Sequence, residues 1–257
     1  VPFIHGRIAK DSPDPPGWGR GSWVDDRAPV LEVIPTPYGA VYSAKRVWND
    51  SDERWHRITQ WVMPFYTMIA AGSPNGCSAR AWVPIDDEYH MLINMHGRLD
   101  GTISEEEQDR AWQPYANSGG YVEETPDPRT RYHTAANKTN DYAINYDIQK
   151  TANMSGIPRG GNLQDRAMTE TMGVIYDRTR EHLGTSDRMI IAARQMLMSA
   201  ARNFQEDGTQ PAHVNDTKLY RIRSASAILP EGADWQEATK ENRDADAGAP
   251  VSFVPLT

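Results

Sequence analysis

The feature that most limits the possible folds is a series of β-rich runs separated by tight turns. Asn, Asp, Gly and Pro gather at the turns, and β-branched and aromatic residues fill the runs between them. The expected strands are residues 30–36, 39–48, 54–69, 77–85 and 88–98, the third of them bent or broken at Pro64. Strands so close together in the chain, and joined by such short turns, predict an antiparallel sheet.

Two helices are expected after the sheet. Over residues 157–183, apolar side chains from Leu163 to Ile175 recur at helical spacing and predict one amphipathic helix with this stripe inward, ended by Gly184. A second helix should begin after Asp187, with an apolar stripe made of Ile190, Ala193, Leu197, Ala201 and Phe204. The order of elements predicts an α+β fold, in which a curved antiparallel sheet grips a long C-terminal helix with a cavity between them.

Two other stretches lack this regularity. Residues 99–150 are charged, contain scattered Gly and Pro, and suggest short helical pieces only around 105–112. We interpret them as a long insertion that forms a lid or a contact surface. Residues 230–257 are expected to form a polar tail.

Composition narrows the class of protein. With 257 residues, of which 39% are hydrophobic, residues 1–257 can bury one sizeable core and are expected to form a single domain. The net charge of −8 argues against a nucleic-acid partner. Cys77 is the single cysteine, which predicts a reducing, cytoplasmic location. The longest apolar run, residues 61–71, is too short to span a membrane, and no secretory leader opens the chain.

Several side chains are candidates for chemistry. Asp165 falls in the first turn of the first expected helix, where it either faces the helix dipole or ligates a metal. His5 follows an apolar segment and is either a packed side chain or a ligand. His90 and His96 share one face of a strand, as a metal pair or as ordinary strand histidines. The chain has no Gly-x-Ser-x-Gly elbow, no Walker loop and no cysteine pattern for a zinc finger or an iron–sulfur cluster.

Four stretches together resemble a known family. Residues 55–69, 81–88 and 162–202, together with 5–7, are similar to the catalytic domain of Rieske non-haem iron aromatic-ring oxygenases. The likeness is to phthalate 4,5-dioxygenase-like and aryl O-demethylase-like members, and it covers most of the chain. The resemblance implies a helix-grip, START-like fold.

The resemblance also assigns metal ligands. The family's motif is similar to Asp-x-x-His-x(4)-His, with a later Asp supplied from a helix. His5 matches the second His, and Asp165 in Gln-Asp-Arg-Ala-Met matches the helical carboxylate. Two imidazoles and one carboxylate leave open positions for dioxygen on a mononuclear Fe(II). The first His, and a Rieske domain with its [2Fe-2S] cluster, are expected upstream of Val1.

The implied activity is that of a terminal oxygenase. It would use O2 for ring dihydroxylation or O-demethylation of an aromatic acid, with electrons from an NADH-dependent reductase, in a trimer. Arg57 and Arg80 lie in strands that could line the cavity, but neither is singled out as the contact to the substrate carboxylate. The alternative is a non-catalytic module that encloses an apolar ligand on the same scaffold. A hydrolase on this scaffold lacks a nucleophile, and no membrane partner is expected.

Overall fold

The structure is a computed structural model, which describes residues 26, 28–48, 51–70, 76–98, 101, 103–106, 108–109, 127, 132–151, 154–157 and 163–246. The chain divides into two compact units. The sheet unit comprises residues 13–83, 92–102 and 182–257. The helical unit comprises residues 1–12, 84–91 and 103–181. The expected single domain over residues 1–257 stays a prediction.

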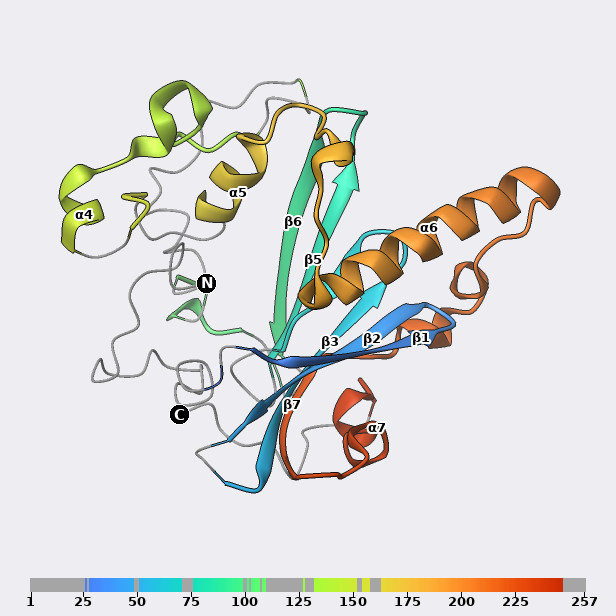
Figure 1. The fold of residues 1–257 in the computed structure, drawn as a ribbon. Helices are drawn as coiled ribbons and strands as arrows, with labels where there is room; N and C mark the ends of the chain where they lie inside the picture. The colour runs from blue at the N-terminus through green and yellow to red at the C-terminus, as the bar shows by residue number, and fades with distance from the viewer. Residues whose placement is uncertain are drawn as a thin grey trace. The chain divides into compact units, whose positions relative to one another are not determined.

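The predicted antiparallel sheet is confirmed (Figure 1). Its strands lie in the order β1-β2-β3-β4-β5-β6, and β7 also pairs with β3, on the same side as β4. The predicted strand 54–69 is interrupted at Pro64, as expected, and forms the two strands β3 and β4. The bounds are β1 Val30–Thr36, β2 Gly39–Val47, β3 Glu53–Val62, β4 Tyr66–Met68, β5 Gly76–Pro84, β6 His90–Arg98 and β7 Ala225–Pro230.

Strand β7 was not predicted from the sequence, because its first half consists of small residues rather than β-branched or aromatic ones. Ala225 and Ala227 are nevertheless buried, and they pair with Ile58 and His56 of β3. Small side chains suit this position because the neighbouring strand already supplies the bulk that fills the core. Strand β3 is therefore an interior strand, with β2 along one side and β7 and β4 along the other.

One face of the sheet unit, here called the α7 face, carries a cluster of buried hydrophobic residues. The strand register places Val41, Ile58 and Ala225 on this face, and Trp235 packs against them. Trp235 opens the short helix α7 (Trp235–Ala238) and donates a hydrogen bond from Nε1 to Glu32 Oε2 at 2.9 Å. The prediction that residues 230–257 form only a polar tail is therefore wrong for this part. A helix of one turn with a single large apolar residue gives too short a pattern to be recognised.

The second predicted helix is confirmed as α6 (Arg188–Asp207), which ends at Gly208 in a left-handed conformation. It lies against β1 and β2, and Arg188 donates a hydrogen bond to the Leu31 carbonyl at 3.3 Å. Figure 1 shows α6 and α7 on opposite sides of these strands, so the second face is called the α6 face.

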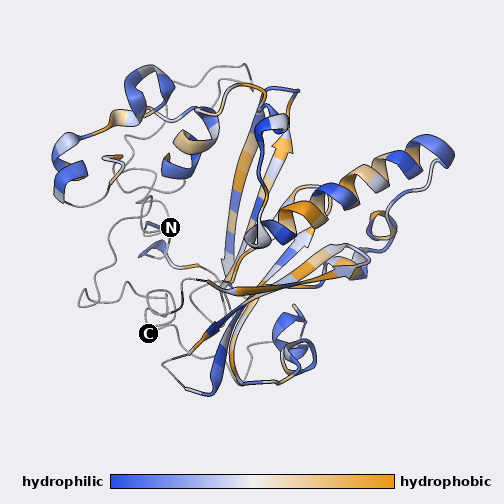
Figure 2. Ribbon diagram, in the orientation of Figure 1, coloured by the Kyte–Doolittle hydropathy of each residue, from blue (hydrophilic) through white to orange (hydrophobic). Residues whose placement is uncertain are grey.

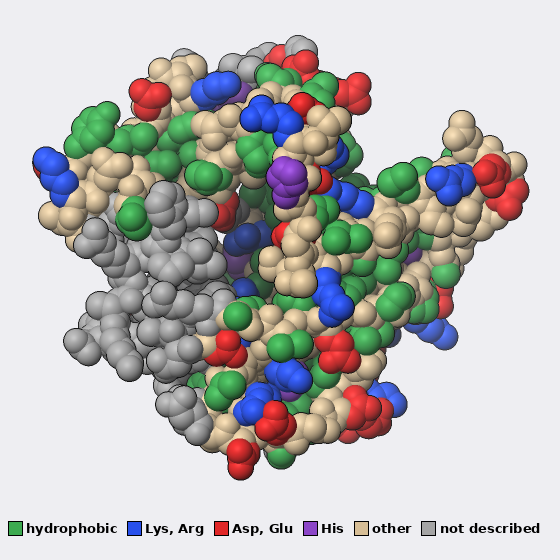
Figure 3. Space-filling model, in the orientation of Figure 1, with side chains coloured by type: hydrophobic (Ala, Val, Ile, Leu, Met, Phe, Trp, Pro, Cys, Tyr) green, Lys and Arg blue, Asp and Glu red, His purple; other side chains and the backbone are tan. Residues whose placement is uncertain are grey.

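The apolar stripe predicted for α6 is mostly exposed, and only its member Ala193 is half-buried. Ile190 and Phe204 are 45% and 56% exposed, whereas Met189 and Met196, outside the predicted stripe, are half-buried. Periodicity identifies an amphipathic helix, but the neighbouring strands decide which side of it faces inward. Figure 2 shows apolar and polar residues interspersed along α6, and in Figure 3 hydrophobic side chains reach its surface.

The first predicted helix is much shorter than expected. Helix α5 spans Leu163–Glu170, instead of residues 157–183, and the 3-10 turn η2 (Arg178–Arg180) follows after an irregular segment. Gly173 has a φ of +106°, which no continuing helix accepts, and the Thr171 hydroxyl donates to the Ala167 carbonyl at 2.6 Å. Gly184 therefore does not end this helix.

Only part of the apolar stripe predicted for the first helix is buried. Leu163 and Ala167 are buried, whereas Met168, Met172 and Ile175 are 49%, 51% and 72% exposed. The last two lie beyond the end of the helix, so they cannot share its inward face. Only the first turns of the predicted stripe therefore pack in the core.

The core of the helical unit is small. Leu163 and Ala167 pack with Ala136, Tyr142 and Ile157, and the 3-10 helix η1 (Lys138–Ala143) leads into α4 (Tyr146–Thr151). These elements come from the last part of the expected insertion 99–150 and from the segment after it. Much of residues 105–112 lies outside the described residues, so the role of the insertion stays a prediction.

These elements confirm the α+β class and the helix-grip arrangement of an open, curved antiparallel sheet with a long helix. Within the described residues, no helix combines the length and the apolar character that crossing a membrane requires.

The turn between β1 and β2 gives a test of the fold. Gly39 has a φ of +146°, and a Cβ there would collide with the carbonyl oxygen of Trp61. Gly39→Ala should therefore lower the free energy of unfolding by about 1–3 kcal/mol in chemical denaturation. Gly184→Ala is the control, because the nearest atom to a Cβ there is Asp187 Oδ2 at 3.9 Å. Equal stability of both variants would contradict the close packing of this turn.

Candidate active site

Asp165 lies in the first turn of α5, on the exposed side of the helix. The opposite side is held by buried Leu163, Gln164 and Ala167, and Gln164 Nε2 donates to the Ile157 carbonyl at 3.2 Å. The carboxylate is thus carried on a helix whose inner side is fixed. Both interpretations of Asp165 are compatible with this position, because a first-turn acid benefits from the helix dipole and is also accessible to a metal.

A polar network fixes the other end of α5. Glu170 Oε2 accepts a hydrogen bond from the Tyr142 hydroxyl at 2.6 Å, and Glu170 Oε1 lies 3.2 Å from Arg166 Nε. Arg166 Nη1 in turn donates to Thr134 Oγ1 at 2.6 Å. Burial and the adjacent Glu170 carboxylate raise the pKa of Tyr142, so the phenol keeps its proton and donates to the carboxylate. The network ties α5 to η1 and to the segment before it.

Sequence reasoning did not identify this network. The i,i+4 spacing of Arg166 and Glu170 is a recognisable helix pair and was the available signal. Tyr142 offers no such signal, because η1 is a short irregular element and its contact to Glu170 spans 28 positions of the sequence.

His90 also belongs to the helical unit, at the start of β6. Partial burial and the Arg166 guanidinium lower the pKa of His90, and the Glu170 carboxylate opposes this. His90 is therefore an uncharged imidazole near the α5 network at neutral pH. His96 lies on the same strand but in the sheet unit, so the proposed pairing of the two stays a prediction.

The described residues do not form a complete metal site by themselves. No three His, Cys, Asp or Glu side chains among them gather closely enough to hold an ion. His5 lies outside the described residues, and its assignment as a ligand stays a prediction. Asp165 is the member of the predicted pair that the structure describes.

Two arginines lie on the α6 face of the sheet. Arg57 is on β3, and Arg80 on β5 is in register with Thr67 of β4, which is in turn in register with Trp61 of β3. Because alternate residues of a strand share a face, Arg57, Trp61 and Arg80 point to the same side. Both guanidinium groups are half-buried.

The charges in this cluster influence one another. Burial lowers the pKa of Arg57; the Tyr42 phenol opposes this, and the like charge of Arg80 adds to the lowering. Burial and the Arg80 charge also lower the pKa of His96. Like charges brought together out of water are costly unless an anion compensates them. This face of the sheet therefore carries positive charge at Arg57 and Arg80.

His56 has a structural role. It is buried on the α7 face, where its Nδ1 lies 2.9 Å from Ser43 Oγ and its ring stacks on Trp235 at 6.4 Å between centroids. Burial lowers the pKa of His56 to about 4; Lys45 adds to the lowering and Glu32 opposes it. His56 is therefore a neutral histidine that packs in the core of the sheet unit.

The comparisons with known proteins agree with this architecture. The family described as LigXa C-terminal domain like matches residues 4–252. The 3-chlorobenzoate-3,4-dioxygenase oxygenase subunit of Comamonas testosteroni is 30% identical over 226 residues, which cover 83% of this chain and 51% of that protein. The phthalate 4,5-dioxygenase oxygenase subunit of Pseudomonas putida is 29% identical over 240 residues, covering 91% and 52%.

These matches confirm the predicted resemblance to Rieske oxygenase catalytic domains. The chain belongs to the LigXa C-terminal domain-like family. It spans about half the length of the curated relatives it matches.

The network around Glu170 predicts a measurable stability effect. Tyr142→Phe removes a donor to a charged acceptor and should lower the free energy of unfolding by about 1.5–3 kcal/mol, as measured in urea. Tyr146→Phe is the matched control, since Tyr146 lies in the same unit and is 70% exposed. If both variants unfolded at the same urea concentration as the unmodified protein, the network would not stabilise the unit.

Proposed function

We propose that this chain is the catalytic part of a terminal oxygenase that uses O2 to oxidise an aromatic acid. Membership of the family supports an oxygenase role, and the two relatives are named for 3-chlorobenzoate and phthalate, which are both aromatic carboxylates. The observation that carries the acid assignment is the cluster of half-buried Arg57 and Arg80 on one face of the sheet. The outcome on the ring is either dihydroxylation or O-demethylation.

The chemistry of the donor set fits a mononuclear Fe(II). Asp165 supplies a carboxylate from a helix whose inner side and C-terminal end are both held by other contacts. The second proposed ligand, His5, lies within the segment that the family matches. A carboxylate combined with imidazoles suits non-haem Fe(II), and the bound metal would activate dioxygen. We assign Asp165 and His5 to hold it, with a further His expected upstream.

Among the described residues, Arg57 and Arg80 are proposed to bind and orient the substrate. Arg57 and Arg80 would each bind a carboxylate through two N–H donors, which fixes the orientation of the ring attached to it. The carboxylate of an anionic substrate is attracted by the two positive charges on this face, whereas a neutral analogue lacks this attraction. Selectivity for acids over neutral aromatics follows from this difference.

Electrons have to reach the site from elsewhere. In the family they come from a Rieske [2Fe-2S] cluster on a neighbouring subunit of a trimer. An NADH-dependent reductase supplies electrons to this cluster. We propose the same partners here, with residues 1–257 acting together as the catalytic domain beside a separate Rieske domain. The cytoplasmic location rests on the single cysteine, Cys77, which is free.

The iron assignment is tested by removing the helical carboxylate. Asp165→Ala, in the full-length iron-loaded protein, should lose most of its bound iron, measured by elemental analysis, while the thermal unfolding midpoint stays close to that of the unmodified protein. Asp147→Ala is the control, because Asp147 is also a first-turn acid in the helical unit. Full iron content in Asp165→Ala would refute the ligand assignment. A full-length unmodified protein that bound no iron would favour the alternative of a non-catalytic binding module.

The acid assignment is tested at Arg80. Arg80→Gln should weaken the binding of phthalate or 3-chlorobenzoate about 10- to 100-fold in calorimetry, which corresponds to about 1.5–3 kcal/mol for hydrogen bonds to a charged group. Arg80→Lys should recover part of the loss because the charge is kept. Arg202→Gln on the exposed side of α6 is the control. If the unmodified protein bound the neutral methyl esters as tightly as the acids, the assignment would be wrong.

A further inference from the structure

A second basic site lies on the α7 face, on the opposite side of the sheet from Arg57. It is a pocket of about 430 Å³, and its walls include Tyr38, Gln60 and Ile222. Gln60 and Arg57 are both on β3 and point to opposite faces, because they are an odd number of residues apart. The pocket is therefore distinct from the arginine cluster of the α6 face.

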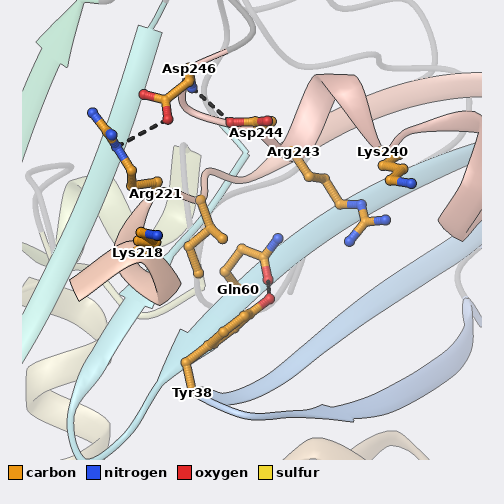
Figure 4. Close-up of a pocket in the computed structure, with 9 residues that line it drawn as sticks. Tyr38, Gln60, Lys218, Arg221, Lys240, Arg243, Asp244 and Asp246 are labelled. Atoms are coloured by element: carbon orange, nitrogen blue, oxygen red, sulfur yellow. Dashed lines mark hydrogen bonds and ion pairs between the residues drawn. The ribbon is translucent and has the colours of Figure 1, made fainter. Parts of the chain in front are cut away.

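The floor of the pocket is polar and fixed. The Tyr38 hydroxyl donates to Gln60 Oε1 at 2.7 Å (Figure 4). Gln60 Nε2 donates to the Arg223 carbonyl at 3.2 Å. Tyr38 and Gln60 are both buried, at 7% and 0% exposure. This arrangement satisfies the amide and presents the Tyr38 ring to the pocket as a rigid surface.

Arg243 is held in position by several contacts. Its Nε donates to Thr239 Oγ1 at 3.1 Å, its Nη2 donates to the Gln236 carbonyl at 2.6 Å, and its guanidinium lies 5.6 Å from the centre of the Trp235 ring. These contacts orient the group and leave Nη1 without a hydrogen bond in the described part of the chain. A fixed guanidinium with remaining donors is suited to bind a carboxylate.

Positive charge dominates the rim. Arg221 Nε pairs with Asp246 Oδ2 at 3.0 Å, so these two charges compensate each other. Among the residues that line the pocket, Asp244 is then the remaining acid, beside Lys218, Lys240 and Arg243. Neither lysine makes an ion pair with any of the described residues. The excess of positive charge is notable in a chain whose net charge is −8.

Figure 4 shows how these charges are distributed. Arg243 and Lys240 lie on one side of the Tyr38–Gln60 pair, and Lys218 and Arg221 lie on the other. The basic groups therefore face the pocket from two sides, with the Tyr38 ring and Ile222 as the apolar surfaces of the same pocket. Two separated positive regions with apolar surface between them match a molecule that has an anionic group at each end.

We propose that this pocket binds a small organic dianion of the dicarboxylate class. One carboxylate would meet Arg243 and Lys240, the other would meet Lys218, and the carbon skeleton would contact Tyr38 and Ile222. A pocket of about 430 Å³ is spacious for an inorganic anion and accommodates a short dicarboxylic acid. Binding here is independent of the proposed oxygenase activity, because the residues lie on the other face of the sheet.

The test uses glutarate as the probe in titration calorimetry. The double variant Lys218→Gln/Lys240→Gln should bind glutarate at least about tenfold more weakly than the unmodified protein. Both lysines are exposed, so circular dichroism should show an unchanged fold. The matched control is Lys138→Gln/Lys150→Gln, which removes the same charge from exposed positions of the helical unit.

Two further arms locate the site and define the ligand. Arg202→Gln should leave glutarate binding unchanged, because Arg202 is exposed on α6, away from the pocket. Butyrate and sulfate should bind at least about tenfold more weakly than glutarate. Butyrate lacks the second carboxylate, and sulfate lacks the carbon skeleton that separates two anionic groups. The proposal is overturned if glutarate does not bind the unmodified protein at millimolar concentration. It is equally overturned if the Lys138/Lys150 control weakens binding as much, or if sulfate binds as tightly as glutarate.

Discussion

The structure depends most on the alternation of side chains along β3. This strand is hydrogen-bonded on both sides, so its residues face either α7 or α6 and have no other direction available. Ile58 and His56 enter the core with Trp235, while Arg57 and Trp55 point to the other side. A slip of one residue in the pairing would exchange the two sets and bury charge in the core, which holds the register firmly.

The same alternation separates two basic regions within an acidic protein. Both regions include a residue of β3. Arg57 belongs to the arginine cluster on one face, and Gln60 lines the pocket around Arg243 on the other. In each region, half-buried guanidinium groups keep their charge in a medium that stabilises it less well than water. An anionic ligand would relieve this cost, so the two proposed ligands are both anionic but have different sites and different functions.

The helical unit solves a different problem, which is to hold one short helix rigidly. Helix α5 has too few residues to be stable alone, so tertiary contacts must supply its stability. Its inner side packs around Leu163 and Ala167, and its last residue, Glu170, is bound by Tyr142 and Arg166. A ligand such as the proposed Asp165 gains from this rigidity, because a metal site tolerates little displacement of its donors.

The sequence by itself determined the local periodicities of this protein: the strands from β1 to β6, the break at Pro64, and the existence of α6. Local side-chain patterns and turn residues are sufficient for these features because they act within a few residues. The tertiary structure decided the phase of α6, the early end of α5, and the burial of Trp235. It also brought Arg57 and Arg80 to the same face, through strand pairings that sequence patterns do not encode. These features depend on contacts between segments that are distant in the sequence. In such cases the segment that packs against a residue, rather than the local sequence pattern, decides which conformation has the lowest free energy.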